Sequence, residues 1–258
     1  MRSLIIIPTY NERENLPVLI ERVLSVTSHA VLVIDDNSPD GTGELADALK
    51  ATRPRRIEVI HRPFKQGLGT AYLTGFKHAL GRGYDYVFQM DADFSHRPED
   101  LPRLVAALDQ GADLALGSRY VDGGRTIGRS ALREMISRGG SRYAGLVLGL
   151  PFKDLTGGFK GYRREALSQL DLEAVRSSGF SFQIETTYQL AKKGLKIVEV
   201  PIEFADRRAG ESKMSGKIMW EALWVVWRLR LSSAGEKSPW TSARQKASKG
   251  DSRGQAKV

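Results

Sequence analysis

Residues 84–93 read YDYVFQMDAD, an apolar run that ends directly in two carboxylates one residue apart. A short apolar run bounded by turn residues is typical of a strand buried in a parallel sheet. At the end of such a strand, Asp91 and Asp93 can point at one divalent cation. Mg²⁺ and Mn²⁺ prefer oxygen ligands and often bridge one or two carboxylates to a substrate's phosphates. Because acidic turns are common, the stretch predicts a metal site only where the rest of the chain supports one.

Strand and helix patterns alternate on both sides of this stretch. Buried strands are predicted at residues 4–7, 31–34, 57–60, 86–90 and 113–116. Helices are predicted between them, at residues 14–26, 43–50, 69–80 and 98–108. This repetition predicts an α/β fold whose central, mostly parallel sheet is flanked by helices.

Polar clusters follow three of the predicted strands. Asn11 and Glu12 follow the first strand, Asp35 and Asp36 the second, and residues 91–93 the fourth. Ligands of parallel sheets bind outside the carboxyl ends of the strands. The three clusters are therefore predicted to meet in one crevice.

The second half of the chain is less regular. A helix is predicted at residues 130–148, a glycine-rich segment at 153–163, a helix at 182–192 and a strand at 197–200. We interpret residues 1–231 as one domain, made of a nucleotide-binding half, an acceptor half and a tryptophan-rich helix (1–117, 118–213 and 214–231). Residues 232–258 are predicted to form a disordered basic tail, with six Lys/Arg against two acidic residues.

Composition narrows the classes of protein that the chain can be. The formal net charge is +9 and cysteine is absent, which excludes disulfides, thiolate zinc sites and cysteine nucleophiles. No segment reaches the ~20 apolar residues that a membrane-spanning helix needs. The basic tail is interpreted either as a solubilising terminus or as a contact with anionic lipid, and no motif supports nucleic-acid binding.

Two motifs resemble known sites without matching them. Residues 67–72 (GLGTAY) begin like a dinucleotide-binding motif, but Tyr72 replaces the third glycine. We therefore predict a tight turn into a helix, whose first N–H groups could face a phosphate. Residues 36–41 (DNSPDG) imitate a calcium loop that Pro39 interrupts, and we interpret them as a turn. His96, close to the acidic turn, is interpreted as a packing residue rather than a functional one.

Two features near the end of the predicted domain each have two interpretations. Residues 206–213 (DRRAGESK) form either a solvated loop or a cationic clamp for phosphates. The helix at 217–231 carries Trp220, Trp224 and Trp227 on one face. That face either packs onto the core or lies at a membrane surface, where tryptophan is favoured.

Five motifs in a fixed order point to a family. They are IPTYNE at 7–12, IDDNSPDGT at 34–42, DADFSH at 91–96, GSRY at 117–120 and GESKM at 210–214. From about residue 3 to about residue 219, the chain resembles the dolichol-phosphate (polyprenol-phosphate) mannose synthases. These are inverting glycosyltransferases of family 2 with the GT-A nucleotide-sugar-binding fold.

The resemblance implies GDP-mannose as donor, a polyprenyl (dolichyl-type) monophosphate as acceptor and Mg²⁺ or Mn²⁺ as cofactor. By motif position, the nucleoside would be held by Pro8, Tyr10, Glu12, Ile34 and Asp36. The diphosphate would be bound, through the metal, by Asp91, Ala92 and Asp93, with Ser95 as a weaker ligand. The acceptor phosphate and the sugar would meet Arg119 and Arg133, and the donor diphosphate would meet Arg207 and Lys213.

Many members of the family have membrane-spanning segments after the catalytic domain, and none is predicted here. The tryptophan-rich helix or a separate membrane-anchoring subunit would therefore bring the enzyme to its lipid. We expect a cytoplasmic protein associated peripherally with the cytoplasmic face of a membrane.

Other functions stay open on the sequence alone. A family 2 transferase using UDP-glucose or another sugar nucleotide would share the first three motifs. A non-catalytic nucleotide-sugar-binding protein at the membrane is a more remote hypothesis, because it would not need this full set of carboxylates and cations.

Overall fold

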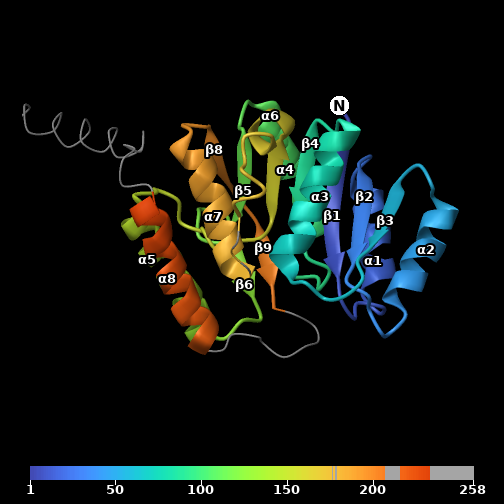
Figure 1. Cartoon of the computed structure of the whole chain (residues 1–258), viewed down its shortest axis with the longest axis horizontal. Coiled ribbons are helices and arrows are strands. Elements are labelled where there is room, and N and C mark those ends of the chain that lie inside the picture. The colour runs from blue at the N-terminus through green and yellow to red at the C-terminus, as the bar shows by residue number, and fades with distance from the viewer. Residues whose placement is uncertain (176, 178, 207–215, 233–258) are drawn as a thin grey trace, which may run out of the picture.

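The computed structural model describes residues 1–175, 177, 179–206 and 216–232 (Figure 1). A seven-stranded sheet forms its centre, in the order β3-β2-β1-β4-β7-β5-β8, and a two-stranded sheet pairs β6 with β9. The strands are β1 (Ser3–Thr9), β2 (Ala30–Asp35), β3 (Ile57–His61), β4 (Tyr86–Gln89), β5 (Leu114–Ser118), β6 (Arg125–Ile127), β7 (Lys160–Arg163), β8 (Ile197–Pro201) and β9 (Glu203–Ala205). The predicted mostly parallel sheet is confirmed.

Helices cover both faces of the large sheet. They are α1 (Leu16–Val26), α2 (Thr42–Thr52), α3 (Leu68–Arg82), η1 (Pro98–Asp100), α4 (Leu101–Asp109), α5 (Ala131–Leu148), α6 (Arg164–Leu167), α7 (Gly179–Lys192) and α8 (Gly216–Ser232). Figure 1 shows α5 and α8 together at one end of the molecule and α2 with β3 at the other.

The run LIII of β1 explains how the two layers are held together. Ile5 and Ile7 belong to a core cluster with side chains of α1, α2 and α4, whereas Leu4 and Ile6 belong to a cluster with side chains of α3, α5, α7 and α8. Successive side chains of a strand point to opposite faces. A strand that is apolar at every position can therefore be buried only between two layers of helices.

The glycine-rich segment predicted at residues 153–163 contains a strand that the sequence pattern did not reveal. β7 runs antiparallel between β4 and β5, with Lys160 opposite Gln89 and Leu116. A Cβ on Gly161 would lie 2.6 Å from Cε1 of Phe88, so glycine allows this close pairing. Because β7 is antiparallel, the loop before it lies at the carboxyl ends of β4 and β5.

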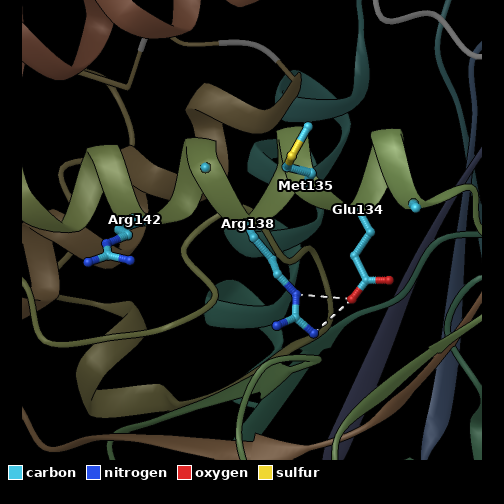
Figure 2. A pocket seen from close by; sticks show the side chains of 6 residues that line it. Glu134, Met135, Arg138 and Arg142 are labelled. Carbon is cyan, nitrogen blue, oxygen red and sulfur yellow. Dashed lines mark hydrogen bonds and ion pairs between the residues drawn. The ribbon is translucent and has the colours of Figure 1, made fainter.

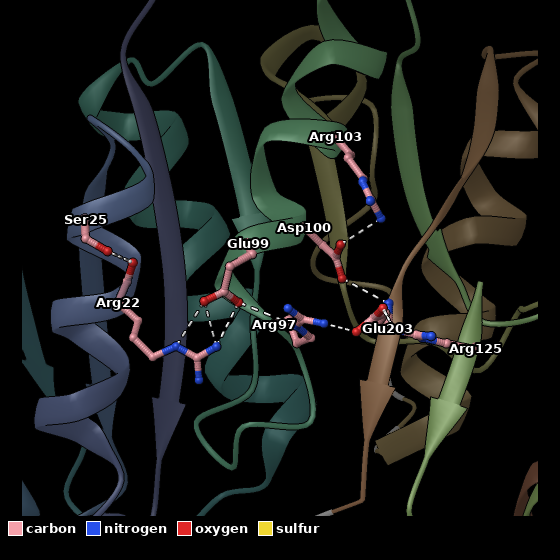
Figure 3. Close-up of polar contacts among 8 residues, drawn as sticks. All are labelled: Arg22, Ser25, Arg97, Glu99, Asp100, Arg103, Arg125 and Glu203. Carbon is pink, nitrogen blue, oxygen red and sulfur yellow. Dashed lines mark hydrogen bonds and ion pairs between the residues drawn. The ribbon is translucent and has the colours of Figure 1, made fainter. Parts of the chain in front are cut away.

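A chain of charged side chains connects α1, η1 and the small sheet (Figure 3). Arg22 holds Glu99 with two nitrogens, and Arg97 pairs with both Glu99 and Glu203. The backbone N–H of Glu203 donates to the buried Asp100, at 3.0 Å. These contacts hold β9 against the segment that follows the acidic turn.

Candidate functional site

The carboxyl ends of β2, β1 and β4 lie next to one another at one edge of the sheet, where the sequence predicts the crevice. The hydroxyl of Thr9 donates to Oδ1 of Asp35 at 2.9 Å, and the N–H of Asp36 donates to the Thr9 carbonyl at 3.1 Å. The N–H of Glu12 donates to the hydroxyl of Thr42 at 3.0 Å. Hydrogen bonds through Thr9 and Thr42 therefore link the segments that carry the first two predicted polar clusters.

Four of the five residues predicted to hold a nucleoside border this crevice. Pro8, Tyr10 and Glu12 are half-buried, and the ring of Tyr10 lies 3.6 Å from Nζ of Lys65. Asp36 is buried and forms an ion pair with Arg62, which fixes the orientation of its carboxylate.

Two residues predicted to contact the donor, Ile34 and Ala92, have side chains that lie in the core. Ile34 is fully buried in the core between β2 and the helices, and Ala92 is buried in the core on the other face. These two side chains therefore pack in the two core clusters, one on each side of the sheet. Neither side chain is placed to touch a nucleotide or a phosphate.

The acidic turn after β4 is held by several hydrogen bonds. Oδ1 of Asp91 accepts from the hydroxyl of Tyr72 at 2.8 Å, and the N–H of Asp91 donates to Nδ1 of His96 at 3.0 Å. Oδ1 of Asp93 accepts from the N–H of Ser95 at 3.0 Å. Both carboxylates are half-exposed, so the turn presents preoriented oxygens at the crevice.

His96 supports this turn and is not presented to solvent. The residue is 2% exposed, and its ring stacks on Phe159 with centroids 5.0 Å apart. Its Nδ1 accepts a hydrogen bond, so the proton of a neutral ring is on Nε2. The interpretation of His96 as a packing residue agrees with this geometry.

Tyr72 is a functional residue that the sequence analysis treated only as a missing glycine. Burial, and then the nearby Asp91 carboxylate, raise the pKa of Tyr72 well above its ordinary value. The hydroxyl therefore stays protonated and donates to Asp91. Since it occupies Oδ1, a second ligand of Asp91 can use Oδ2.

The donor set fits a divalent cation that is shared with a substrate. Across the described part of the chain, no three His, Asp or Glu residues gather into a complete metal site. Mg²⁺ is commonly bound through one or two carboxylates together with substrate phosphates. Asp91 and Asp93 are the carboxylates here that could act as such ligands. Ser95 is 1% exposed, so the prediction of its hydroxyl as a ligand is not supported.

Arg119, predicted to meet the acceptor, already has a carboxylate partner. Its Nε and Nη2 each donate to Asp154 at 2.7 Å, and its N–H donates to the same carboxylate at 3.0 Å. Arg119 is 5% exposed and Asp154 is fully buried. Burial alone would lower the pKa of Arg119, but the hydrogen bonds and charge of Asp154 outweigh it and raise that pKa. The ion pair anchors the loop before β7.

Further arginines gather around two aromatic rings beside this ion pair. The guanidinium carbons of Arg119 and Arg129 lie 5.0 and 5.8 Å from the ring centre of Phe204, and that of Arg138 lies 4.7 Å from Tyr120. Nη1 of Arg129 is buried and has no hydrogen-bond partner among the described residues. Burial, and then the charge of Arg119, lower the pKa of Arg129. This cluster is suited to an added anion.

The exposed side of α5 continues from the cluster as a shallow depression of about 450 Å³ (Figure 2). Its lining residues are Ala131, Glu134, Met135, Arg138, Gly139 and Arg142. Arg138 pairs with Glu134 at 2.7 Å. Arg133, on the same helix, lies 3.5 Å from Asp206 and is half-exposed. The depression thus combines an apolar side chain with several cations.

Large apolar side chains are exposed on α5 and α8, which pack against each other. The Tyr143 hydroxyl contacts the carbonyl of Leu223 at 3.5 Å. The exposed apolar residues of this surface, which we name the α5–α8 face, are Leu132, Met135, Leu146, Leu223, Trp224, Trp227 and Leu231. Trp224 is 68% exposed, so the interpretation that places all the tryptophans against the core is wrong for this residue.

Several predictions concern parts of the chain that cannot be placed in this site. Arg207 and Lys213, and the tail from residue 233 onward, lie outside the described residues. The same holds for the side chain of Trp220. Among the helices that are described, none has both the length and the apolar character to cross a membrane.

Asp154 and Arg129 were missed because no sequence signal pointed to them. Asp154 is 35 residues from its partner Arg119, within a segment whose obvious feature was glycine. Arg129 lies just before the helix predicted at residues 130–148, in no motif of the sequence. Their roles depend on β7 and β9, which bring these segments to the crevice.

Comparison with known proteins places this geometry in a family. Residues 4–171 match the model of glycosyl transferase family 2. A structure of glucosyl-3-phosphoglycerate synthase from Mycobacterium tuberculosis, with Mn²⁺, uridine diphosphate and glucosyl-3-phosphoglycerate, is similar with a TM-score of 0.64. The similarity covers 92% of this chain and 81% of that one, at 18% identity, and shows the fold. The predicted GT-A fold is confirmed.

Three named relatives have a much higher sequence identity to this chain than that structure has. The chain is 50% identical over 232 residues to the polyprenol monophosphomannose synthase of Mycolicibacterium smegmatis, covering 89% of this chain and 88% of that protein. It is 49% identical over 237 residues to the undecaprenyl-phosphate mannosyltransferase of Micrococcus luteus, covering 92% and 97%. It is 39% identical over 234 residues to the dolichol-phosphate mannosyltransferase of Pyrococcus furiosus, covering 89% and 64%. The chain belongs to glycosyl transferase family 2.

Proposed function

We propose that this protein transfers mannose from GDP-mannose to a polyprenyl (dolichyl-type) monophosphate, with inversion at the anomeric carbon. The observation that carries the proposal is the identity of about half of the residues, over nearly the whole length, with two proteins named for mannose transfer to such lipids. The proposed catalytic domain spans residues 1–231, and residues 232–258 form a basic tail.

The donor would bind along the crevice from β2 to β4. Pro8, Tyr10, Glu12 and the oriented Asp36 would hold the nucleoside. The diphosphate would then reach Asp91 and Asp93, which end the adjacent strand. This order follows from the sheet, because β2, β1 and β4 are neighbours.

Asp91 and Asp93 would hold Mg²⁺ or Mn²⁺ between themselves and the diphosphate. When bound, such an ion neutralises the negative charge that develops on the departing GDP. The Mn²⁺ in the M. tuberculosis neighbour supports a divalent metal in this fold. We propose Arg207 and Lys213 as the further cations on the leaving group.

The acceptor phosphate would bind at the cluster of Arg119, Arg129 and Arg133. Because Asp154 neutralises Arg119, Nη1 of Arg129, which has no partner within the described part of the chain, is the better placed donor to an incoming anion. The cations would position the phosphate rather than activate it. A phosphate monoester has a second pKa of about 6, so its oxygen is largely ionised at neutral pH.

The reaction then balances without a protein base. A phosphate oxygen of the lipid attacks the anomeric carbon, and the bond from that carbon to the donor's phosphate oxygen breaks. The electron pair leaves with GDP. The protein contributes by alignment of the two phosphates and by electrostatic stabilisation of the leaving group.

The α5–α8 face would bring the site to its lipid. It combines exposed Trp224 and Trp227 with Arg138, Arg142 and Arg230, a pattern suited to an interface with anionic headgroups. We propose peripheral binding to the cytoplasmic face of a membrane, with the depression on α5 next to the acceptor phosphate. A separate membrane-anchoring subunit is the alternative if vesicles alone do not bind.

The test is a transfer assay with purified protein. Radiolabelled GDP-mannose, Mg²⁺ or Mn²⁺ and a short polyprenyl phosphate are incubated, and the label entering the organic phase is counted. Metal-dependent transfer from GDP-mannose but not from UDP-glucose is expected. Transfer from UDP-glucose alone would overturn the donor assignment, and metal-independent transfer would overturn the metal.

A further inference from the structure

Gln183 is a buried polar residue to which the proposed reaction has assigned no role. It lies on α7 and is 2% exposed. Neither Nε2 nor Oε1 has a hydrogen-bond partner among the described residues. A buried carboxamide left without a partner carries the full desolvation cost of its donor and acceptor groups. Such a side chain is expected where a ligand supplies the missing partners.

The amide lies next to the acidic turn, across a space that a glycine leaves open. A Cβ on Gly158 would lie 3.3 Å from Nε2 of Gln183, 3.5 Å from Cε1 of His96 and 3.8 Å from Oδ2 of Asp91. Gly158 and Asp91 are half-exposed, so this space borders the crevice. It also borders the carboxylate oxygen of Asp91 that Tyr72 does not occupy.

The backbone that carries Gln183 is held from two sides. Nζ of the buried Lys160 donates to the backbone carbonyl of Gln183 at 2.7 Å. The preceding residue, Phe182, stacks on Tyr72 with centroids 6.1 Å apart, and Tyr72 donates to Asp91. One packed unit therefore positions both Gln183 and the carboxylate proposed to bind the donor's metal, as a preorganised binding site requires.

We infer that Gln183 is a specificity-determining residue that binds a hydroxyl of the donor sugar; the inference rests on the proposed transfer from a sugar nucleotide. A hydroxyl both donates and accepts, so sugar hydroxyls can satisfy both amide atoms. A phosphate only accepts and would leave Oε1 unpaired. The anomeric carbon is bonded to the diphosphate proposed to bind at Asp91, and we assign the hydroxyl of the next ring carbon to the space beside Gly158.

Mannose and glucose differ in the configuration of that hydroxyl. A site that hydrogen-bonds one configuration rejects the other because its buried polar atoms are left unpaired. Gln183 would therefore favour GDP-mannose over GDP-glucose. It touches the sugar alone, so the affinity for GDP should not depend on it.

The test compares Gln183→Leu with the wild-type full chain. Affinities for GDP and GDP-mannose are measured by calorimetry with Mn²⁺ present, and kcat/KM is measured for GDP-mannose and GDP-glucose. The variant is expected to bind GDP normally. Because two hydrogen bonds are lost, its affinity for GDP-mannose should fall about 10- to 100-fold, and so should its ratio of kcat/KM for GDP-mannose to kcat/KM for GDP-glucose. Its Tm should be unchanged or higher, because an unpaired amide has been replaced by an apolar group of similar size.

Two further variants complete the design. Gly158→Ala fills the space from the opposite side and should cause the same selective loss. Gln189→Leu is the control: it makes the same exchange on α7 away from the site, at a side chain that accepts from the N–H of Asp171. It should leave kcat/KM for both sugar nucleotides unchanged.

The outcomes separate this inference from the proposed function. If wild-type protein does not bind GDP-mannose, the proposed function fails and this inference fails with it. If wild-type protein binds it and Gln183→Leu keeps the full preference for mannose, this inference alone is overturned. A fall in Tm with an equal loss for GDP and both sugar nucleotides would show a structural role and would also overturn it.

Discussion

Breaking the buried ion pair between Arg119 and Asp154 should be among the most destabilising single changes in this protein. Asp154→Ala removes a fully buried carboxylate and leaves Arg119, 5% exposed, without a counter-charge. Breaking a buried pair in this way costs about 3–5 kcal/mol of the free energy of unfolding. For a chain of this size, each kcal/mol corresponds to roughly 2–4 °C in Tm, so a fall of roughly 6–20 °C is expected.

The assay is urea and thermal denaturation of a double-mutant cycle. Arg119→Met combined with Asp154→Leu replaces both charges by apolar groups and should recover most of the loss, because apolar side chains of similar volume often replace a buried pair at little cost. Glu173→Ala is the matched control. Its pair with Lys77 is exposed and should contribute less than about 1 kcal/mol.

Two results would refute this reasoning. A loss below about 1 kcal/mol for Asp154→Ala would mean that Arg119 finds water or another partner. A double variant as unstable as the sum of the single variants would mean that the two side chains do not interact.

The remaining predictions concern the site, the surface and pH. Tyr72→Phe removes the hydrogen bond to Asp91 and should weaken Mn²⁺ affinity about 10- to 100-fold in a titration with GDP present, and an unchanged affinity would contradict a role in orienting the carboxylate. Trp227→Ser should reduce sedimentation with anionic vesicles without lowering Tm, since the side chain is exposed; full binding would count against the α5–α8 face. Burial acts to raise the pKa of Glu58, but hydrogen bonds from Tyr84 and His78 outweigh burial and lower that pKa. The ionised carboxylate therefore stabilises the folded protein above its ordinary pKa of 4.5, and this stabilisation is lost as the pH falls through the lower pKa of the folded state. Denaturation of Glu58→Gln should show a shallower loss of stability in that acid range, and an unchanged slope would contradict the assignment.

The acidic strand ends illustrate how far local pattern can lead to a site. Asp36 and Asp91 were predicted at one crevice because the carboxyl ends of parallel strands share an edge, and the structure places both strands beside β1. The same pattern could not show that Tyr72 and Arg62 hold these carboxylates. Both contacts join elements that are separate in the chain.

Ile34 and Arg119 show what motif position leaves open about a predicted contact. Each lies in a motif that borders the crevice, yet Ile34 points into the core and Arg119 is engaged by Asp154. The orientation of a side chain at a strand end depends on pairing register and on its neighbours. A motif does not specify either.

The sequence by itself determined the α/β class, the alternation of strands and helices along the first half of the chain and the residues that follow its strands. These follow from local periodicity, because a strand that is apolar at every position has to be buried on both faces. Tertiary structure alone decided the insertion of β7, the pairing of Arg119 with Asp154 and the burial of Gln183 beside Gly158. Each of these depends on contacts between distant segments, whose geometry is settled only when the packed core brings them together.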